Sequence, residues 1–330
     1  MRVATFNLES LDLPPRAARP IEARIDMLRP ELERADADIL CLQEVNGQRV
    51  PDEPQRVLAA LDQLIEGTQY QSFYRSATHH TSGHGVADVH NLVTLSRWPI
   101  LSSRSIRHDF IQPLRYRTAT AQPPAQDDEE IGFDRPALAA EIEIAGGRTL
   151  HVVNCHLRAP LASSIAGQKQ APFVWSTISG WAEGFCISSI KRNAQALEIR
   201  LFVDRLIEAD RYVDVILAGD FNAEDTESPL RLLVGAEQDT GNGALAAASM
   251  IVLDRGVPAD RRFSVVHQGR PQMLDHMLCS RALYGRFKEI QIYNEALSDE
   301  AVAYARVDRP TGSSHACVVA EFSDIAVSAV

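Results

Sequence analysis

Short apolar runs recur along the whole chain, and several of them end in a polar or charged side chain. Their lengths and internal alternation are typical of β-strands. The first run contains two candidate core residues, Val3 and Phe6, and a later one has a turn at Trp98–Pro99. The predicted strands are RVATFNLE (2–9), ADILCLQEV (37–45), HNLVTLSRWPI (90–100), VDVILAGD (213–220), MLDHMLCS (273–280) and ACVVAEF (316–322).

Helical spacing of apolar residues is found in three further segments. The first covers 22–36, where Pro30 is expected to kink or split the helix. The second covers 53–67 and is closed by Gly67, and the third, at 188–210, has Ser188 or Ser189 as its N-cap. Two β runs around Gly146–Gly147 predict a hairpin in ALAAEIEIAGGRTLHVVNCHL (137–157).

Two segments between these elements are predicted to be irregular. Residues 121–136 are rich in Pro and acidic residues and are expected to form an exposed loop. Residues 158–190 mix Ser, Gly, Pro and Trp, and long loops of this kind in folded domains are usually functional or mobile. Because no linker or repeat divides the chain, we expect one layered domain over 1–330, with a specificity-loop insertion at about 158–190.

Composition and charge limit the function classes. The 330 residues are 45% hydrophobic and 23% charged, which is ordinary for a globular protein. The net charge of −11 argues against an extended nucleic-acid track, since such affinity comes from neutralising phosphates. The five cysteines are widely spaced, which favours reduced thiols. No signal peptide and no membrane span is expected, so the predicted location is cytoplasmic, and no protein partner is inferred.

The polar side chains at the strand ends are the candidate chemistry. Each alone has an ordinary explanation, because Asn and Asp often begin turns. His315 lies between Ser314 and an apolar run, and its neighbours alone favour a structural role. Repetition at many strand ends weakens that explanation, since charged groups beside apolar runs need partners or a metal. The set consists of Asn7, Glu44, Asn154, His156, Asp220, Asn222, Asp275 and His276.

These side chains are carboxylates, amides and histidines, which suit hard cations such as Mg²⁺ and Mn²⁺. The spacing of a structural zinc site is absent, and so are the glycine-rich loops that hold nucleotides. A Cys155–His156 nucleophile pair is disfavoured, because neighbours on a strand point to opposite faces.

Seven motifs in order resemble the endonuclease/exonuclease/phosphatase superfamily, which includes DNase I-like nucleases, abasic-site endonucleases, inositol polyphosphate phosphatases and neutral sphingomyelinases. They are TFNLE, LCLQEV, LVTLSRWPI, VVNCHL, AGDFNAE, MLDHMLCS and SSHACVVAEF, and they span 3–322. LCLQEV and GDFN are fairly specific individually. The resemblance implies an α+β fold, a four-layer α/β/β/α sandwich of two mostly antiparallel sheets flanked by helices, with the site at the ends of the sheets.

The resemblance also implies residue roles. Glu44 matches the principal Mg²⁺ ligand of the family, and Asn7 lies beside it near metal and phosphate. Asp220 matches the carboxylate that orients or deprotonates the attacking water, and Asn222 the amide that holds the phosphate or that water.

The histidines complete the implied site. His156 matches the first phosphate-contacting histidine, and Asp275 the carboxylate that orients His315. An Asp275–His315 hydrogen bond would raise the pKa of the ring. Asn154, on the strand face of His156, and Arg192 are candidate substrate contacts.

One position departs from the family pattern. The last motif usually reads Ser-Asp-His, and here it reads Ser313-Ser314-His315. The missing carboxylate commonly contacts the metal, so the sequence predicts an active enzyme with weaker Mg²⁺ affinity than relatives that carry Asp.

Three functions remain open. The first is an Mg²⁺-dependent phosphodiesterase or nuclease acting through an activated water, with Mn²⁺ as the alternative ion. The second is a phosphomonoesterase of the inositol- or lipid-phosphatase kind, and the third is a non-catalytic binding protein. Each of the first two takes a phosphoester substrate, from a nucleic acid to a small ester. In 158–190, Trp175, Trp181 and Phe185 are equally consistent with base stacking and with packing onto the body.

Overall fold

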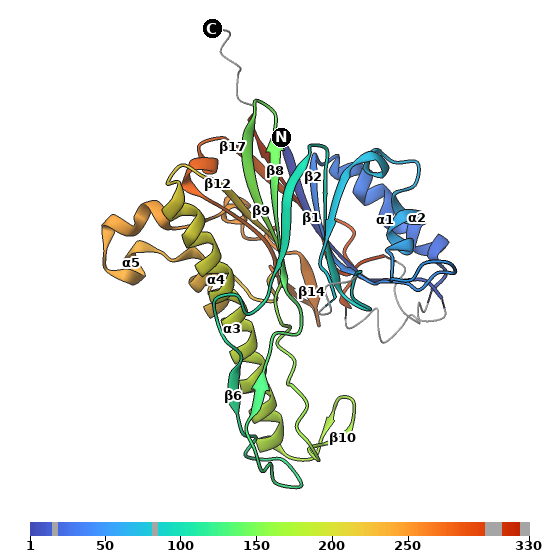
Figure 1. Cartoon of the computed structure of the whole chain (residues 1–330), viewed down its shortest axis with the longest axis vertical. Helices are drawn as coiled ribbons and strands as arrows, with labels where there is room; N and C mark the ends of the chain where they lie inside the picture. The colour runs from blue at the N-terminus through green and yellow to red at the C-terminus, as the bar shows by residue number, and fades with distance from the viewer. Residues whose placement is uncertain (15–18, 81–84, 301–311, 324–330) are drawn as a thin grey trace.

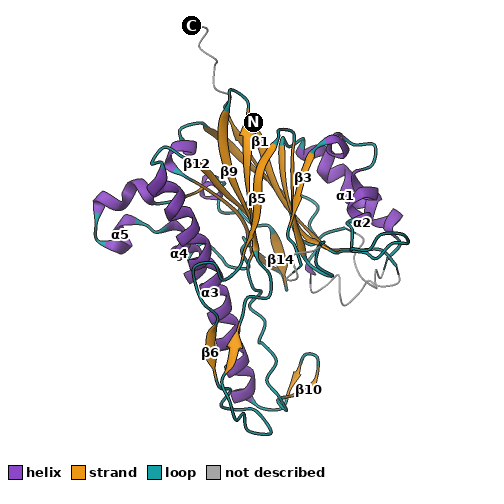
Figure 2. Ribbon diagram, viewed as in Figure 1, coloured by secondary structure: helices purple, strands orange, loops and turns teal. Residues whose placement is uncertain are grey.

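Two six-stranded β-sheets pack face to face at the centre of the protein (Figures 1 and 2). The computed structural model describes residues 1–14, 19–80, 85–300 and 312–323. In spatial order, the first sheet contains β17 (Phe287–Tyr293), β18 (Cys317–Phe322), β1 (Arg2–Leu11), β2 (Ile39–Val45), β4 (Asn91–Ser96) and β3 (Tyr74–Ala77). The second contains β13 (Ile251–Val252), β16 (Asp275–Cys279), β12 (Asp214–Asp220), β9 (Arg148–His156), β8 (Ala137–Ile144) and β5 (Ile100–Ile106).

Both sheets are mostly antiparallel. The parallel neighbours are β1 with β2 in one sheet and β9 with β12 in the other. The hairpin predicted around Gly146–Gly147 is formed by β8 and β9, and both glycines have positive φ. Three two-stranded ribbons lie outside the sheets: β6 (Leu114–Tyr116) with β7 (Glu129–Ile131), β10 (Lys169–Ala171) with β11 (Val174–Trp175), and β14 (Val265–His267) with β15 (Arg270–Gln272).

Helices cover the outer face of each sheet (Figure 2). α1 (Ile21–Ala35) and α2 (Ala59–Ile65) share an apolar cluster with the first sheet, and α3 (Ile178–Ala209) and α4 (Ser228–Val234) share one with the second. Two one-turn helices, α5 (Glu237–Thr240) and α6 (Arg281–Tyr284), lie in later connections. The predicted α/β/β/α sandwich of two mostly antiparallel sheets is confirmed.

Strand alternation divides the core into layers. In β1, Val3 faces the second sheet, whereas Phe6 packs with α1 and α2, and both are buried as predicted. The space between the sheets is filled by side chains of moderate size, such as Cys41, Val152 and Ile216. This packing fixes the position of the strand ends of one sheet relative to those of the other.

Three predicted boundaries differ from the structure. α1 runs through Pro30 without splitting. α2 begins at Ala59, later than the predicted 53. In the segment predicted to be an exposed loop, β7 forms a strand and Phe133 is buried.

The long helix α3 is the largest difference. Its N-cap is Thr177, whose side chain accepts a hydrogen bond from the Gly180 amide, so the predicted start at Ser188 or Ser189 was wrong. Much of the segment predicted to be irregular is therefore helix, preceded by the β10–β11 hairpin. Figure 1 shows the first half of α3 extending beyond the sheets, flanked by β6 and β10. None of the helices in the described part of the chain is long and apolar enough to cross a bilayer.

Candidate active site

Strand direction brings the polar residues of both sheets together. The parallel pairs β1–β2 and β9–β12 place their C-terminal ends at the same edge of the sandwich, and Asp220 lies opposite His156 in register. The antiparallel strand β16 starts at this edge, with Asp275 opposite Asp220. His315 comes just before β18, which is antiparallel to β1, so it reaches the same place.

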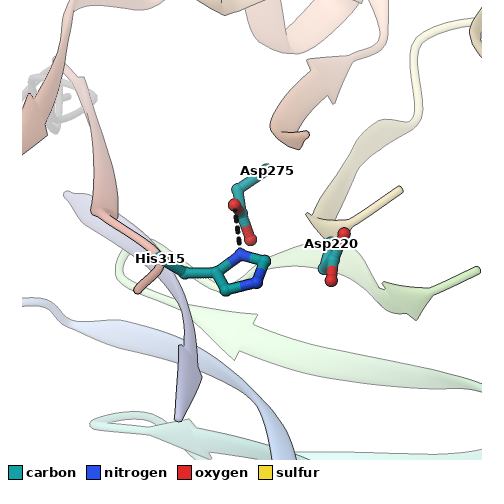
Figure 3. A group of neighbouring side chains, drawn as sticks. All are labelled: Asp220, Asp275 and His315. Atoms are coloured by element: carbon teal, nitrogen blue, oxygen red, sulfur yellow. Dashed lines mark hydrogen bonds and ion pairs between the residues drawn. The ribbon is translucent and has the colours of Figure 1, made fainter. Parts of the chain in front are cut away.

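Asp275 is buried and forms a hydrogen-bonded pair with the partly buried His315. His315 Nδ1 is 2.8 Å from Asp275 Oδ2, and the ring lies between Asp275 and Asp220 (Figure 3). Burial works against the charged ring, but the Asp275 carboxylate outweighs it and, with Asp220 and Glu44, raises the pKa of His315 to about 10. His315 is therefore an imidazolium at neutral pH.

Asp220 is oriented by two amides. Asn7 Nδ2 donates to Asp220 Oδ2 at 3.0 Å, and the Asn222 backbone N–H donates to Oδ1 at 2.8 Å. Asn222 has a φ of 48°, and this turn after β12 also brings its Nδ2 within 3.2 Å of Asp220 Oδ2. Burial and the nearby Asp275 charge raise the pKa of Asp220 to about 7, against the opposing effect of His315.

Glu44, the last residue but one of β2, has an unusual backbone conformation. Its φ of 59° is uncommon for a residue with a side chain, and such strain is concentrated at functional sites. Oε2 accepts hydrogen bonds from the Ser10 backbone N–H at 3.0 Å and hydroxyl at 3.1 Å, while Oε1 is 3.7 Å from His156 Nε2. Burial opposes ionisation, yet His90, Arg135 and His315 together hold the pKa of Glu44 below its usual value.

His156 is buried and lies between acidic groups and an arginine. Its Nε2 is 3.4 Å from Asp220 Oδ2, and Nη1 of Arg135 is 2.9 Å from the same ring nitrogen. Burial first, and then the Arg135 charge, lower the pKa of His156 well below its usual value. His156 is therefore a neutral imidazole, which donates a hydrogen bond from one ring nitrogen and accepts one at the other.

Two site residues were missed by the sequence analysis. Arg135 comes from the acidic, Pro-rich stretch before β8, and His90 comes from the connection before β4, where its Nε2 is 3.8 Å from Glu44 Oε2. Burial lowers the pKa of each. Their local sequence carries no signal, because their approach to Glu44 depends on how the loops pack.

The two predicted substrate contacts are bonded to protein groups. Asn154 spans the sheets, since its Nδ2 donates to the Leu42 and Val93 carbonyls and its Oδ1 accepts from Gln43. Arg192 donates to the Asn222 carbonyl and, at 3.0 Å, to Glu227. These bonds give both side chains a positioning role, and their contact with substrate stays a prediction.

The donor set fits a hard divalent cation. Asp220 and Asp275 place carboxylate oxygens within 4.8 Å of one another and of the His315 ring, which as an imidazolium has no lone pair to offer a cation. Asp275 Oδ1 is buried and has no hydrogen-bond partner among the described residues, so it has capacity for a further contact. Asn7 and Glu44, the predicted ligands, add an amide and a carboxylate beside Asp220. Oxygen donors of this kind are those preferred by Mg²⁺ and Mn²⁺.

Sequence comparison identifies the class to which this fold and site belong. A model of the Endonuclease/Exonuclease/phosphatase family matches residues 4–315. The chain belongs to this family, which confirms the resemblance found in the strand-end motifs. No curated protein matches it significantly in sequence.

Solved structures show the same fold at low identity. An endonuclease/exonuclease/phosphatase from Bacteroides vulgatus is 16% identical with a TM-score of 0.56, covering 98% of this chain and 98% of that one. A D. rerio TDP2 humanized by 14 mutations is 15% identical with a TM-score of 0.56, covering 98% and 99%. An AP endonuclease from Archaeoglobus fulgidus is 14% identical with a TM-score of 0.50, covering 98% and 100%. At these identities the likeness concerns the fold alone.

Proposed function

We propose that the protein hydrolyses phosphodiester bonds with Mg²⁺, or Mn²⁺ in its place, by attack of a water molecule. The cluster of Asp220, Asp275 and His315 carries this proposal, because it combines a carboxylate that can take a proton with a protonated ring. The family to which the chain belongs is named for enzymes that act on phosphoesters.

Asp220 is the candidate general base. Its pKa of about 7 is close to working pH, where a base is most effective. Asn7 and Asn222 donate to its oxygens and so fix the direction in which it can accept the water proton. The assignment agrees with the role that the family motif implies for this residue.

His315 is the candidate phosphate contact. As an imidazolium held by Asp275, it can donate from Nε2 to a phosphate oxygen and neutralise charge that develops in the transition state. His156 adds a neutral donor, and Arg135 adds a fixed positive charge beside it.

Glu44 and Asn7 would hold the metal, with Asp220 next to them. When bound, Mg²⁺ would supply neutralisation of charge on the phosphate oxygens. The Ser10 donors fix one oxygen of Glu44, which leaves the other directed toward the site. A carboxylate oriented in this way loses little freedom on binding a cation.

Activity assays distinguish the three functions. The purified protein is incubated with Mg²⁺ or Mn²⁺ and bis-p-nitrophenyl phosphate, p-nitrophenyl phosphate, plasmid DNA or RNA, with a chelator control. Diester cleavage that disappears with chelator and in Asp220→Asn supports the proposal. Turnover of the monoester alone would establish a phosphomonoesterase instead. No turnover of any substrate by the folded protein would favour a non-catalytic role.

A further inference from the structure

The first half of α3 carries a row of exposed apolar side chains. Ile178 is 85% exposed, Trp181 45% and Phe185 36%. The Trp181 and Phe185 rings are stacked, with centroids 5.5 Å apart and planes at 25°. Large apolar groups gathered in this way on a soluble protein usually mark a binding surface. We refer to these three residues as the aromatic stripe.

The stripe lies on the side of α3 that faces the body. At about 100° per residue, Trp181, Arg192 and Ile199 fall within roughly 20° of one another around the helix axis. Arg192 and Ile199 are buried against the second sheet, and Arg192 donates to the Asn222 carbonyl. The same side is exposed at the stripe because the sheets end before it, as Figure 1 shows for the lower part of α3.

The stripe therefore borders the space just beyond the catalytic residues. β9 and β12 end at His156 and Asp220, and the first half of α3 continues past those ends. At ~1.5 Å per residue, Phe185 and Trp181 precede Arg192 by roughly 10 and 16 Å along the helix. A substrate bound at the site and extended along α3 would reach the two rings roughly 10 to 16 Å beyond the level of Arg192.

Neighbouring segments cover the other side of this half-helix. Gly180 and Gly184 let Gln168, the Ser163 carbonyl and the Trp175 ring approach closely. Trp175 is thereby half-buried and lies under Lys169 in a cation–π contact. Of the four aromatic residues in 158–190, Trp175 packs onto the protein, whereas Phe173, Trp181 and Phe185 are exposed.

Two cations lie between the stripe and the site. Arg158 Nη1 is 3.1 Å and Lys191 Nζ 2.9 Å from the same carboxylate, Asp134. Because one carboxylate faces two cations, a local positive charge remains. Asp134 directly precedes Arg135 in the chain, so the charge of Arg135 lies nearby. A phosphate between the stripe and the catalytic site would lie near this positive charge. A lipid with a single headgroup has no second phosphate to place there.

We propose that the aromatic stripe binds nucleobases of a short single-stranded nucleic acid whose phosphodiester lies at the catalytic site. This inference rests on the proposed function and names its substrate class. Bases stack on exposed aromatic rings in a manner that tolerates any sequence, and Arg and Lys between the rings contact the phosphates. The acidity of the whole chain fits a short strand rather than a long duplex.

Binding measured without turnover tests the stripe separately. In chelator, fluorescence anisotropy is followed with labelled oligothymidylate of about eight nucleotides and with an abasic strand of equal length and charge. The wild type should prefer the strand with bases. Trp181→Ala and Phe185→Ala should each reduce that preference about tenfold. Trp181→Phe should keep most of it, which separates ring loss from misfolding.

The control is Leu197→Ala. Leu197 is 39% exposed on the same helix, roughly 160° from Trp181 around the axis. It should keep the wild-type preference for bases. The inference fails if the wild type binds both strands equally or if the stripe variants retain the preference.

A lipid surface is the competing partner. Phe173, in the β10–β11 turn, is 86% exposed at the same end of the molecule. Flotation with phosphatidylcholine vesicles that depends on Trp181, without any preference for bases, would overturn the inference. Hydrolysis of bis-p-nitrophenyl phosphate, which is too small to reach the stripe, tests the proposed function independently. If this ester is not hydrolysed but the protein still prefers strands with bases, the proposed activity is wrong, and the stripe remains a binding surface for bases.

Discussion

At the scale of single residues, Arg135 brings a positive charge into a site that contains several carboxylates. Its half-buried guanidinium lies beside His156 and interacts electrostatically with Glu44 and Asp220. This charge, after that of His90, helps to lower the pKa of Glu44, and after burial it helps to lower the pKa of His156. A fixed cation that needs no reorganisation during the reaction is the kind of group that stabilises a phosphoryl transition state.

Arg135→Ala should lower kcat/KM for bis-p-nitrophenyl phosphate about 100-fold, the usual effect of losing one preorganised donor. It should also move the pH profile, because the pKa of His156 rises when the neighbouring charge is removed. Arg135→Lys should restore part of the rate. The matched control is Arg115→Ala, whose side chain is 63% exposed in β6. Unchanged kinetics and pH profile in Arg135→Ala would contradict the assignment.

His276 is a buried histidine that serves the site indirectly. Nδ1 is 3.0 Å from Asp254 Oδ2, and Nε2 is 2.9 Å from the Ala223 carbonyl, so His276 ties the turn after Asn222 to β16. Burial opposes its charge, but Asp254 outweighs burial and raises the pKa of His276 to about 9. Asp275 and Asp225 also interact with the ring.

This pair should make stability fall in alkali. Because the folded pKa lies above the unfolded value, the stabilisation is complete below about pH 6.5 and is lost as pH rises through about 9. We expect wild-type protein to lose ~3 kcal/mol more unfolding free energy than Asp254→Asn between pH 6.5 and 10. Urea titrations across that range measure it. Parallel pH curves for the two proteins would show that the pair carries no linked proton.

The residues predicted from the sequence share a simple property. Glu44, Asp220 and His156 stand at the ends of apolar strands, and parallel strand ends converge whatever the loops do. His315 looked structural from its neighbours and acquired its role only beside Asp275. Arg135 depends on the fold of a loop, and a loop position carries no periodic pattern from which its tertiary neighbours follow.

At the scale of elements, α3 shows why helix boundaries are hard to predict. Its first turns contain Gly180 and Gly184, which have low helix propensity, and their neighbours are largely apolar or small. The structure gives these glycines a packing reason, since side chains there would collide with Gln168 and Ser163. Tertiary contacts thus compensate for the low helix propensity of these turns. The periodicity of the sequence does not reveal such contacts.

Gly184→Val should detach the segment before α3. A Cβ at this position would collide with the Ser163 carbonyl and lie 2.9 Å from the Trp175 ring, where the Ser163 amide also donates to Gly184. Overpacking of this kind costs ~1–3 kcal/mol. Trypsin cleavage after Arg158 and Lys169 should therefore accelerate at least about fivefold.

The control for this change is a substitution two residues earlier, at an exposed position of α3. Ala182→Val adds the same β-branched side chain to α3 at an exposed position, so it tests helix propensity without the collision. It should leave the cleavage rate close to that of the wild type. Equal acceleration in both variants would mean that the effect comes from helix propensity and not from the glycine contact.

At the scale of the whole molecule, the site joins the two sheets. Glu44 comes from the first sheet and Asp220 from the second, and their negative charges repel each other. This repulsion contributes to the raised pKa of Asp220, although burial and Asp275 contribute more. The Gln43–Asn154 hydrogen bond of 2.8 Å holds the sheets together behind them. The fold therefore brings like charges together, and a divalent cation between them would stabilise the folded state.

Magnesium should raise the melting temperature of the protein. A ligand at a hundred times its Kd stabilises the folded state by ~2.7 kcal/mol, which corresponds to roughly 4 °C for a chain of 330 residues. Glu44→Gln should abolish the shift. Ser314→Asp should reach half of the shift at lower Mg²⁺, because it restores the carboxylate that the family pattern has there. Differential scanning fluorimetry at matched ionic strength measures all three. An equal shift in Glu44→Gln would show that the ion binds elsewhere, and an unchanged midpoint in Ser314→Asp would show that Ser314 does not limit affinity.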